Sequence, residues 1–185
     1  MRNPVNLQFC GFGGQGIILS AVIMGTAVVK EAGLNALQTQ SYGSEARGGQ
    51  CQAELIVSPE PINSPLADQI DILVAMSQSA LDRYLDRLRS GGTLLIDPGL
   101  VATPERSDIK TIKVPATQTA SEIGPKIIAN MVVLGFVQQA TGLISEADLY
   151  QAIRENVPAK FLEANLKAAK CGMGLARKQN VKVEV

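Results

Sequence analysis

The strongest chemical signature in this sequence is a glycine-rich segment, GFGGQG, that begins at Gly11. Gly11, Gly13 and Gly16 have the spacing G-x-G-x-x-G, in which backbone N–H groups and the start of a following helix suit an anion such as a pyrophosphate. Gly14 adds a position where a ligand or another chain can approach the backbone, and the Gln15 amide can both donate and accept a hydrogen bond. Alternatively, the glycines only permit a tight turn and close packing of a helix on a strand.

Use of this segment for NAD would also require an acidic side chain at the end of the second strand, where it binds the ribose hydroxyls. Residues 38–41 (QTQS) occupy that stretch and carry no charge. Glu31 comes too early, on the predicted helix, and Glu45 lies within the following loop. No basic residue stands there for a 2′-phosphate. A simple NAD(P) dehydrogenase is therefore the weaker interpretation.

A second segment, residues 41–49 (SYGSEARGG), combines glycines with a tyrosine, a carboxylate and a guanidinium in a predicted loop. It is expected at the carboxyl edge of the sheet, where ligands of open α/β folds bind. Arg47 could bind a phosphate or carboxylate through two parallel hydrogen bonds, and Glu45 could orient Arg47 or bind a partner. Alternatively, the two form an exposed pair worth less than about 1 kcal/mol. The candidate binding residues of both segments are Gly11, Gly13, Gly14, Gln15, Gly16, Ser41, Tyr42, Glu45, Arg47, Gly48 and Gly49.

Apolar stretches separated by glycine and proline predict the elements that position these segments. Strands are predicted over residues 5–10, 34–39, 51–58, 70–76, 93–96 and 111–114. Helices are predicted over residues 17–31, 79–90 (capped by Ser79 and ended by Gly91 and Gly92), 125–141, 146–157, and along a final stripe of Leu162, Leu166, Ala169 and Met173. The alternation indicates an α/β fold: a Rossmann-like, open, mostly parallel sheet with helices on both faces and a helical C-terminal part. Residues 1–185 are expected to form a single domain.

Composition excludes several classes of function. The 185 residues include 17 basic and 17 acidic side chains and no histidine, with a pI of about 6.3. A chain without net charge has no broad field for nucleic acid, and without histidine it has no His-based triad or His metal ligand. Three cysteines are too few for the usual four-thiolate ligation of an iron–sulfur cluster, and they indicate a reducing cytoplasm. The longest apolar stretch, residues 16–29, is shorter than the roughly 20 residues that span a bilayer, so no membrane insertion is expected.

Charged residues are scarce, at 18% of the chain against about 25% in an average soluble domain. A small domain with so few charges could bury part of its surface against a partner. It could equally be a compact domain whose surface is rich in uncharged polar residues. Both interpretations stay open at this point.

The segments 11–16 and 41–49 together resemble the gamma subunit of 2-oxoacid:ferredoxin oxidoreductases. Weaker matches are Asp97-Pro98, which closes a predicted strand, and residues 130–135 (NMVVLG), which lie in a predicted helix. The resemblance runs from about Leu7 to Leu175 and is closest to the 2-oxoglutarate member, although pyruvate, 2-oxoisovalerate and indolepyruvate relatives share both segments. It implies a multi-subunit enzyme that converts a 2-oxo acid, coenzyme A and oxidised ferredoxin to acyl-CoA, carbon dioxide and reduced ferredoxin.

The resemblance also implies a division of labour. The complex would use thiamine diphosphate, Mg²⁺, [4Fe-4S] clusters and coenzyme A, while this chain alone would bind no cofactor and supply no catalytic residue. Its partners would be alpha, beta and delta-type subunits, with ferredoxin reached through the complex. Arg47 would face an anionic group, with Tyr42 packed alongside and Glu45 holding the guanidinium.

The remaining alternatives are a free-standing Rossmann-like nucleotide-binding oxidoreductase or isomerase, and a ligand-sensing module.

Overall fold

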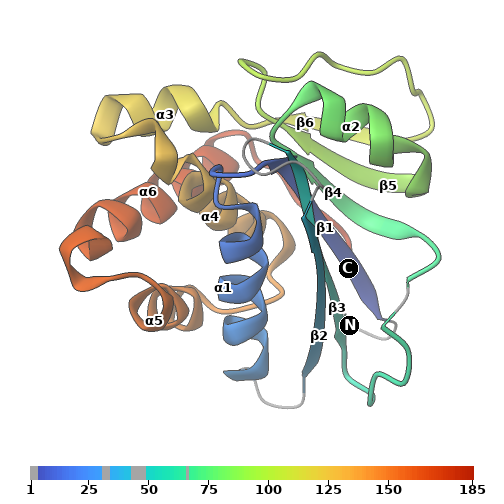
Figure 1. Cartoon of the computed structure of the whole chain (residues 1–185), viewed down its shortest axis with the longest axis horizontal. Coiled ribbons are helices and arrows are strands. Elements are labelled where there is room, and N and C mark those ends of the chain that lie inside the picture. The colour runs from blue at the N-terminus through green and yellow to red at the C-terminus, as the bar shows by residue number, and fades with distance from the viewer. Residues whose placement is uncertain (1–3, 31–33, 43–48, 66) are drawn as a thin grey trace.

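The computed structural model describes residues 4–30, 34–42, 49–65 and 67–185. Their framework is a six-stranded sheet in the order β2-β3-β1-β4-β5-β6 (Figure 1). The strands are β1 (Val5–Phe12), β2 (Asn35–Tyr42), β3 (Gln50–Ser58), β4 (Ile70–Ala75), β5 (Leu88–Ile96) and β6 (Lys110–Lys113). The neighbours β1, β4, β5 and β6 pair in parallel, whereas β3 runs antiparallel to both β1 and β2. The prediction of an α/β fold with a mostly parallel sheet is confirmed.

Helices cover both faces of this sheet, but unequally (Figure 1). The helices are α1 (Ile17–Lys30), α2 (Gln78–Tyr84), α3 (Ala116–Ile123), α4 (Ala129–Thr141), α5 (Glu146–Asn156) and α6 (Ala159–Lys178), with short 3₁₀ turns η1 (Leu85–Arg87) and η2 (Lys126–Ile128). α1 packs on β1, β2 and β3, with α4, α5 and α6 beside and behind it, whereas α2 lies on the opposite face. This arrangement confirms the predicted helices on both faces and the helical C-terminal part.

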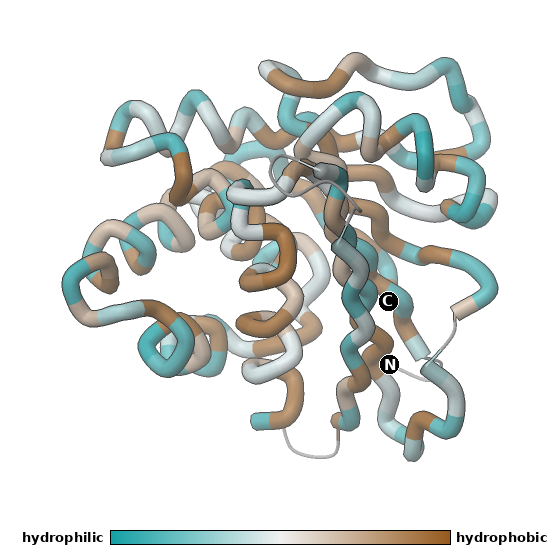
Figure 2. The backbone as a smooth tube through the Cα atoms, viewed as in Figure 1, coloured by the Kyte–Doolittle hydropathy of each residue, from teal (hydrophilic) through white to brown (hydrophobic). Residues whose placement is uncertain are grey.

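The strand pattern explains why two hydrophobic cores form. Leu7 and Phe9 of β1 point toward α1 and belong to the main core, while Cys10 points toward α2 and belongs to a smaller core with Leu81. Figure 2 shows the consequence: α1 and α4 are apolar along most of their length, whereas α2 and α3 carry more hydrophilic residues. No helix of the described ranges is both long enough and apolar enough to cross a membrane.

The predicted helix over residues 79–90 is wrong at its start. The cap of α2 is Ser77, whose Oγ accepts a hydrogen bond from the Ala80 N–H at 3.3 Å, rather than Ser79. Helical structure ends with η1, and β5 already begins at Leu88. The apolar spacing that suggested a longer helix arises because Leu81 and Leu88 enter the same core from two different elements.

The same prediction is wrong about Gly91 and Gly92, which lie inside β5. The pairing of β5 with β4 is irregular there, since Ile70 pairs with Leu88 but Ile72 pairs with Thr93. Gly91 has a φ of +74°, and its N–H donates to the Asp108 carbonyl at 2.7 Å. The two glycines therefore permit a bulge in a strand rather than the end of a helix.

α3 is not predicted by the sequence, because its eight residues, ATQTASEI, are few and include isoleucine as their one large apolar side chain. A buried carboxylate stabilises this helix, which its own residues do not strongly favour. Asp97, only 2% exposed at the end of β5, accepts hydrogen bonds from the Gly99 N–H at 3.0 Å and the Thr117 N–H at 2.7 Å. A carboxylate at these backbone donors stabilises the start of α3.

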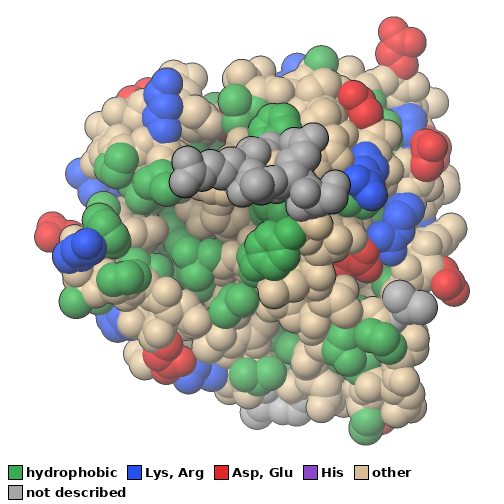
Figure 3. All heavy atoms as spheres, viewed as in Figure 1, with side chains coloured by type: hydrophobic (Ala, Val, Ile, Leu, Met, Phe, Trp, Pro, Cys, Tyr) green, Lys and Arg blue, Asp and Glu red, His purple; other side chains and the backbone are tan. Residues whose placement is uncertain are grey.

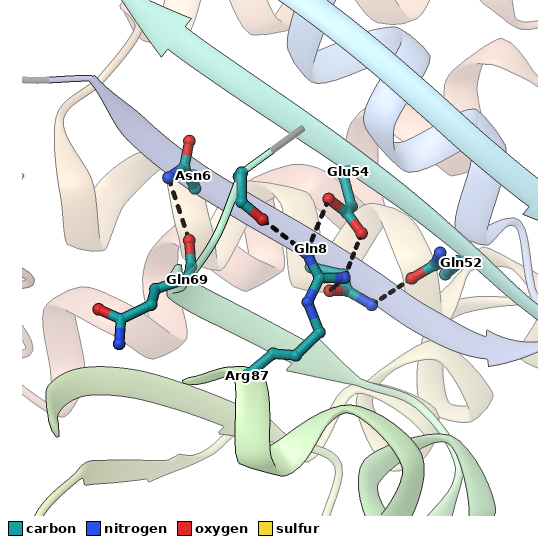
Figure 4. A network of polar contacts seen from close by, with 7 residues as sticks. Asn6, Gln8, Gln52, Glu54, Gln69 and Arg87 are labelled. Carbon is teal, nitrogen blue, oxygen red and sulfur yellow. Dashed lines mark hydrogen bonds and ion pairs between the residues drawn. The ribbon is translucent and has the colours of Figure 1, made fainter. Parts of the chain in front are cut away.

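A polar network crosses the sheet on its α2 side (Figure 4). The fully buried Gln8 of β1 donates from Nε2 to Gln52 Oε1 of β3 at 2.5 Å. Arg87 of η1 binds Glu54 of β3 with both terminal nitrogens and donates to the Ala67 carbonyl at 2.9 Å. Arg87 thereby fastens η1 and the connection after β3 onto the sheet.

Candidate functional site at the glycine turn

The glycine-rich segment connects β1 to α1 at the carboxyl edge of the sheet, as predicted (Figure 1). Gly11 is buried inside β1 and pairs with Cys51 of β3. Residues 12–16 form what we call the glycine turn, in which Gly14 and Gly16 have φ values of +94° and +74° that L side chains rarely adopt. Gly13 and Gly14 are exposed. The turn therefore presents bare backbone to solvent, while Gly11 serves packing.

Gln15 holds the glycine turn to the sheet through both ends of its amide. Its Oε1 accepts a hydrogen bond from the Phe12 N–H at 2.7 Å, and its Nε2 donates to the Met76 carbonyl at 2.8 Å. A Cβ on Gly11 would lie 2.5 Å from this Oε1, so Gly11 must lack a side chain for Gln15 to take its place. The amide of Gln15 thus joins the end of β1 to the end of β4.

Replacing Gln15 by alanine is expected to lower the free energy of unfolding by about 1–3 kcal/mol, because a backbone donor and a backbone acceptor lose their partner. Chemical denaturation with urea measures the change. Gln118→Ala is the matched control, since Gln118 is exposed and its amide donates to the nearby Glu122 side chain of α3, and it should change stability by less than about 0.5 kcal/mol. Equal stability of the two variants would contradict a positioning role for Gln15.

The Gly16 carbonyl is the point where α4 reaches the glycine turn. It accepts hydrogen bonds from the Ser20 N–H at 2.9 Å, the Ser20 Oγ at 3.0 Å and the Asn130 Nδ2 at 3.4 Å. A Cβ on Gly16 would lie 2.8 Å from Asn130 Cγ. Residues 130–135, which contribute to the family resemblance, thus begin in direct contact with the glycine turn.

The second predicted segment meets the glycine turn through one backbone hydrogen bond. The Gly13 N–H donates to the Gly49 carbonyl at 2.9 Å. The prediction that Ser41 and Tyr42 lie in a loop is wrong. They are the last two residues of β2, because the pairing of β2 with β3 continues to the end of the strand. Tyr42 is 66% exposed at that end of the sheet. Glu45, Arg47 and Gly48 lie outside the described residues.

The sheet order bears on the nucleotide-binding alternative. In dinucleotide-binding folds, the strand that follows the first helix pairs directly with the first strand and brings its acidic end to the ribose. Here β3 lies between β1 and β2, so the uncharged end of β2 is one strand further from the glycine turn. This geometry argues against a free-standing NAD enzyme.

Two cavities flank the glycine turn and are not predicted by the sequence. One of about 330 Å³ lies between Gly16 and the start of α6, with Lys160 on its rim. The other, of about 300 Å³, lies between Gly14 and Met76, with Lys126 on its rim. Ile127, which is 64% exposed, lines both. Only the packing of η2 and α6 beside α1 brings these residues together, so no local sequence signal could have found them.

Two buried cysteines, Cys10 and Cys51, lie near this edge of the sheet. Burial raises the pKa of the Cys10 thiol, with Cys51 nearby as a second cause, and burial also raises the pKa of Cys51, so both stay protonated. Within the described ranges, no three or more His, Cys, Asp or Glu side chains gather as metal ligands. The described residues therefore offer no thiolate set for an iron–sulfur cluster, whereas exposed backbone beside two lysines suits an anionic group.

Fold and site together define an α/β domain with a candidate binding site at one edge of its sheet. Exposed glycine backbone, lysine side chains and apolar side chains lie together there. The chain belongs to the pyruvate ferredoxin/flavodoxin oxidoreductase family, which it matches over residues 6–175. It is 44% identical to 2-oxoglutarate synthase subunit KorC of Methanothermobacter marburgensis over 176 residues, covering 91% of this chain and 95% of that subunit.

Two solved structures show the same fold. The keto/oxoacid ferredoxin oxidoreductase gamma subunit of Geobacter sulfurreducens matches with a TM-score of 0.85 and 37% identity, covering 95% of this chain and 98% of that one. The 2-oxoglutarate:ferredoxin oxidoreductase of Magnetococcus marinus, solved with 2-oxoglutarate, coenzyme A and succinyl-CoA, matches with a TM-score of 0.87 and 26% identity. The match covers 96% of this chain but 32% of that one, so there the fold is part of a longer chain.

Proposed function

We propose that this chain is the gamma-type subunit of a multi-subunit 2-oxoacid:ferredoxin oxidoreductase in the cytoplasm. The complex converts a 2-oxo acid, coenzyme A and oxidised ferredoxin to acyl-CoA, carbon dioxide and reduced ferredoxin. The 44% identity to a 2-oxoglutarate synthase subunit favours 2-oxoglutarate as the substrate. Alpha, beta and delta-type subunits are the partners, and ferredoxin binds to the complex rather than to this chain.

The hydrogen bond between Gly13 and Gly49 is the observation that carries the proposal. It joins both glycine-rich segments at the sheet edge, beside the cavities that Lys126 and Lys160 border. Exposed main chain and flanking lysines suit the phosphates of coenzyme A or thiamine diphosphate, or a loop of a neighbouring subunit. In this proposal Arg47, two residues before Gly49 in the second segment, adds a further cation for the same anionic group.

The remaining cofactors belong to the partners in this proposal. Thiamine diphosphate with Mg²⁺ would supply the chemistry for carbon–carbon bond cleavage of the 2-oxo acid, and [4Fe-4S] clusters would supply the route for its electrons to ferredoxin. In this proposal both metal groups are held by other subunits. The role of this chain is to complete the wall of the site and hold coenzyme A or the cofactor there.

Purification of the tagged chain from its native host tests the proposal. We expect it to bring down thiamine-binding and cluster-binding chains in a complex that absorbs in the visible range and reduces ferredoxin. Among several 2-oxo acids, 2-oxoglutarate should give the largest kcat/KM. Recovery of a single chain that binds NAD tightly, with no associated subunits, would contradict it.

Substitutions at the edge test the binding role within that complex. Lys126→Gln, Lys160→Gln and Arg47→Ala are each expected to raise the KM for coenzyme A about tenfold, which corresponds to the loss of one charge-assisted contact. The kcat should change less, because none of these residues reacts. Lys178→Gln at the exposed end of α6 is the control and should leave both parameters unchanged. Wild-type coenzyme A kinetics in all three variants would dismiss the assignment.

A further inference from the structure

The outer edge of β2 is unusually open to another strand. β2 ends the sheet order, so β3 pairs with one of its sides, while the other side has no strand partner among the described residues (Figure 1). Its eight residues, NALQTQSY, include no charge and no proline. Soluble proteins usually protect such an edge with lysine, proline or a bulge, because unpaired backbone groups invite another strand.

An apolar strip of α1 borders this edge on one face of the sheet. Val22, Gly25 and Val29 follow one another at helical spacing and line a shallow groove of about 280 Å³ together with Ala36 and Gln38 of β2. Val29 is 59% exposed. Figure 3 shows this side of the molecule, where hydrophobic and uncharged atoms predominate over α1 and β2 and charged side chains lie mostly toward the periphery.

We infer that the β2 edge and the α1 strip bind a second copy of this chain, with the two β2 strands antiparallel about a twofold axis perpendicular to the sheet. A twofold contact presents the same surface twice, so a charged strand would meet its own charges. The uncharged β2 avoids that penalty in every register. The contact would join two six-stranded sheets into one, with both α1 helices on the same face.

One register also covers the most exposed apolar groups of this surface. If Gln38 lies opposite Gln38 of the second copy, Tyr42 of that copy lies opposite Leu34. Tyr42 points to the same face of the sheet as Ala36 and Gln38, which lie beside Val29. Tyr42 is 66% exposed and Val29 is 59% exposed in the single chain, and this register brings Tyr42 of one copy to the end of β2 where Val29 of the other lies beside Ala36.

The size of the surface sets the strength of the contact. An eight-residue strand and one helix strip provide fewer residues than the roughly 20–30 on each side of a standard interface. We therefore expect a reversible dimer that dissociates on dilution. The β2 edge ends at Tyr42, which is separated from Gly11 of β1 by Cys51 of β3, but the inference does not depend on the proposed enzymatic role.

Sedimentation velocity of the purified full-length chain tests the inference. The wild-type chain should shift from monomer to dimer between low and several hundred micromolar concentration. Gln38→Lys and Gln38→Glu each place like charges at the axis and should raise the dimer dissociation constant about fivefold or more. An equimolar mixture of the two variants should restore dimerisation, because lysine then faces glutamate.

The rescue by mixing distinguishes a lost contact from a misfolded variant, since two misfolded chains cannot restore each other. Gln118→Lys on α3 is the control for a charge placed elsewhere, and it should dimerise like the wild type. A wild-type chain that stays monomeric at every concentration would overturn the inference and leave the edge to a different protein. Dimers of Gln38→Lys as tight as wild type, or a mixture that stays monomeric, would overturn it equally.

Discussion

Replacing Gly135 or Gly172 by alanine is expected to lower the free energy of unfolding by about 3 kcal/mol, since a rigid core has no room for the added methyl group. α4 and α6 cross at these two positions. A Cβ on Gly135 would lie 2.7 Å from the Ala169 carbonyl carbon, and a Cβ on Gly172 would lie 2.8 Å from the Val132 carbonyl carbon. These neighbours are helix backbone, so the helices must separate to accept either methyl group. Urea denaturation followed by circular dichroism measures the loss.

Gly174→Ala is a matched control on the same helix. A Cβ there has no heavy atom within 4 Å beyond its local neighbours. The alanine should therefore stabilise the protein by roughly 0.5–1 kcal/mol, through the higher helix propensity of alanine alone. A similar gain for Gly172→Ala would show that α4 and α6 do not make this close contact.

The double variant Gly135→Ala with Gly172→Ala adds a test of the mechanism. Both methyl groups push apart the same pair of helices, so one separation relieves both clashes. The double variant should therefore lose less stability than the sum of the single variants. Strict additivity would indicate two unrelated defects rather than one shared helix crossing.

Features set by neighbouring residues could be predicted from the sequence. The strand, glycine turn and helix that begin the chain follow from alternation, glycine spacing and a long apolar stretch, and the structure has β1, the turn and α1 in these places. The same holds for α5, which lies within the predicted range 146–157 and is capped by Ser145. The family resemblance succeeded because it depends on such local segments.

Features set by distant residues could not be predicted. Nothing local indicates that β3 lies between β1 and β2, or that Gly135 and Gly172 meet across two helices. The helix predicted over residues 79–90 fails for the same reason: the sheet extends β5 back to Leu88 against the local apolar spacing. At the site, nothing local indicates that the Gln15 amide bonds to the backbone of both Phe12 and Met76.

Replacing Arg87 by methionine is the second substitution with a large expected effect, a loss of about 3 kcal/mol in unfolding free energy. Arg87 forms a bidentate ion pair with Glu54, and its Nη1 also donates to the Oε1 of the buried Gln8 at 3.4 Å (Figure 4). The hydrogen bond with Glu54 is the main cause that raises the pKa of Arg87. Methionine preserves most of the apolar stem but leaves the Glu54 carboxylate, with only 13% of its side chain exposed, without its cation.

Two comparisons isolate the cost of that unpaired carboxylate. Arg177→Met breaks the pair with Glu146, in which the side chains are 58% and 43% exposed, and should cost less than about 0.5 kcal/mol because water replaces the partner. Adding Glu54→Leu to Arg87→Met should recover part of the loss, since no buried charge then remains. Because these residues bind each other directly, a coupling energy of about 1–3 kcal/mol is expected. Equal effects of Arg87→Met and Arg177→Met in urea denaturation would show that the pair on the α2 side behaves as an ordinary surface contact.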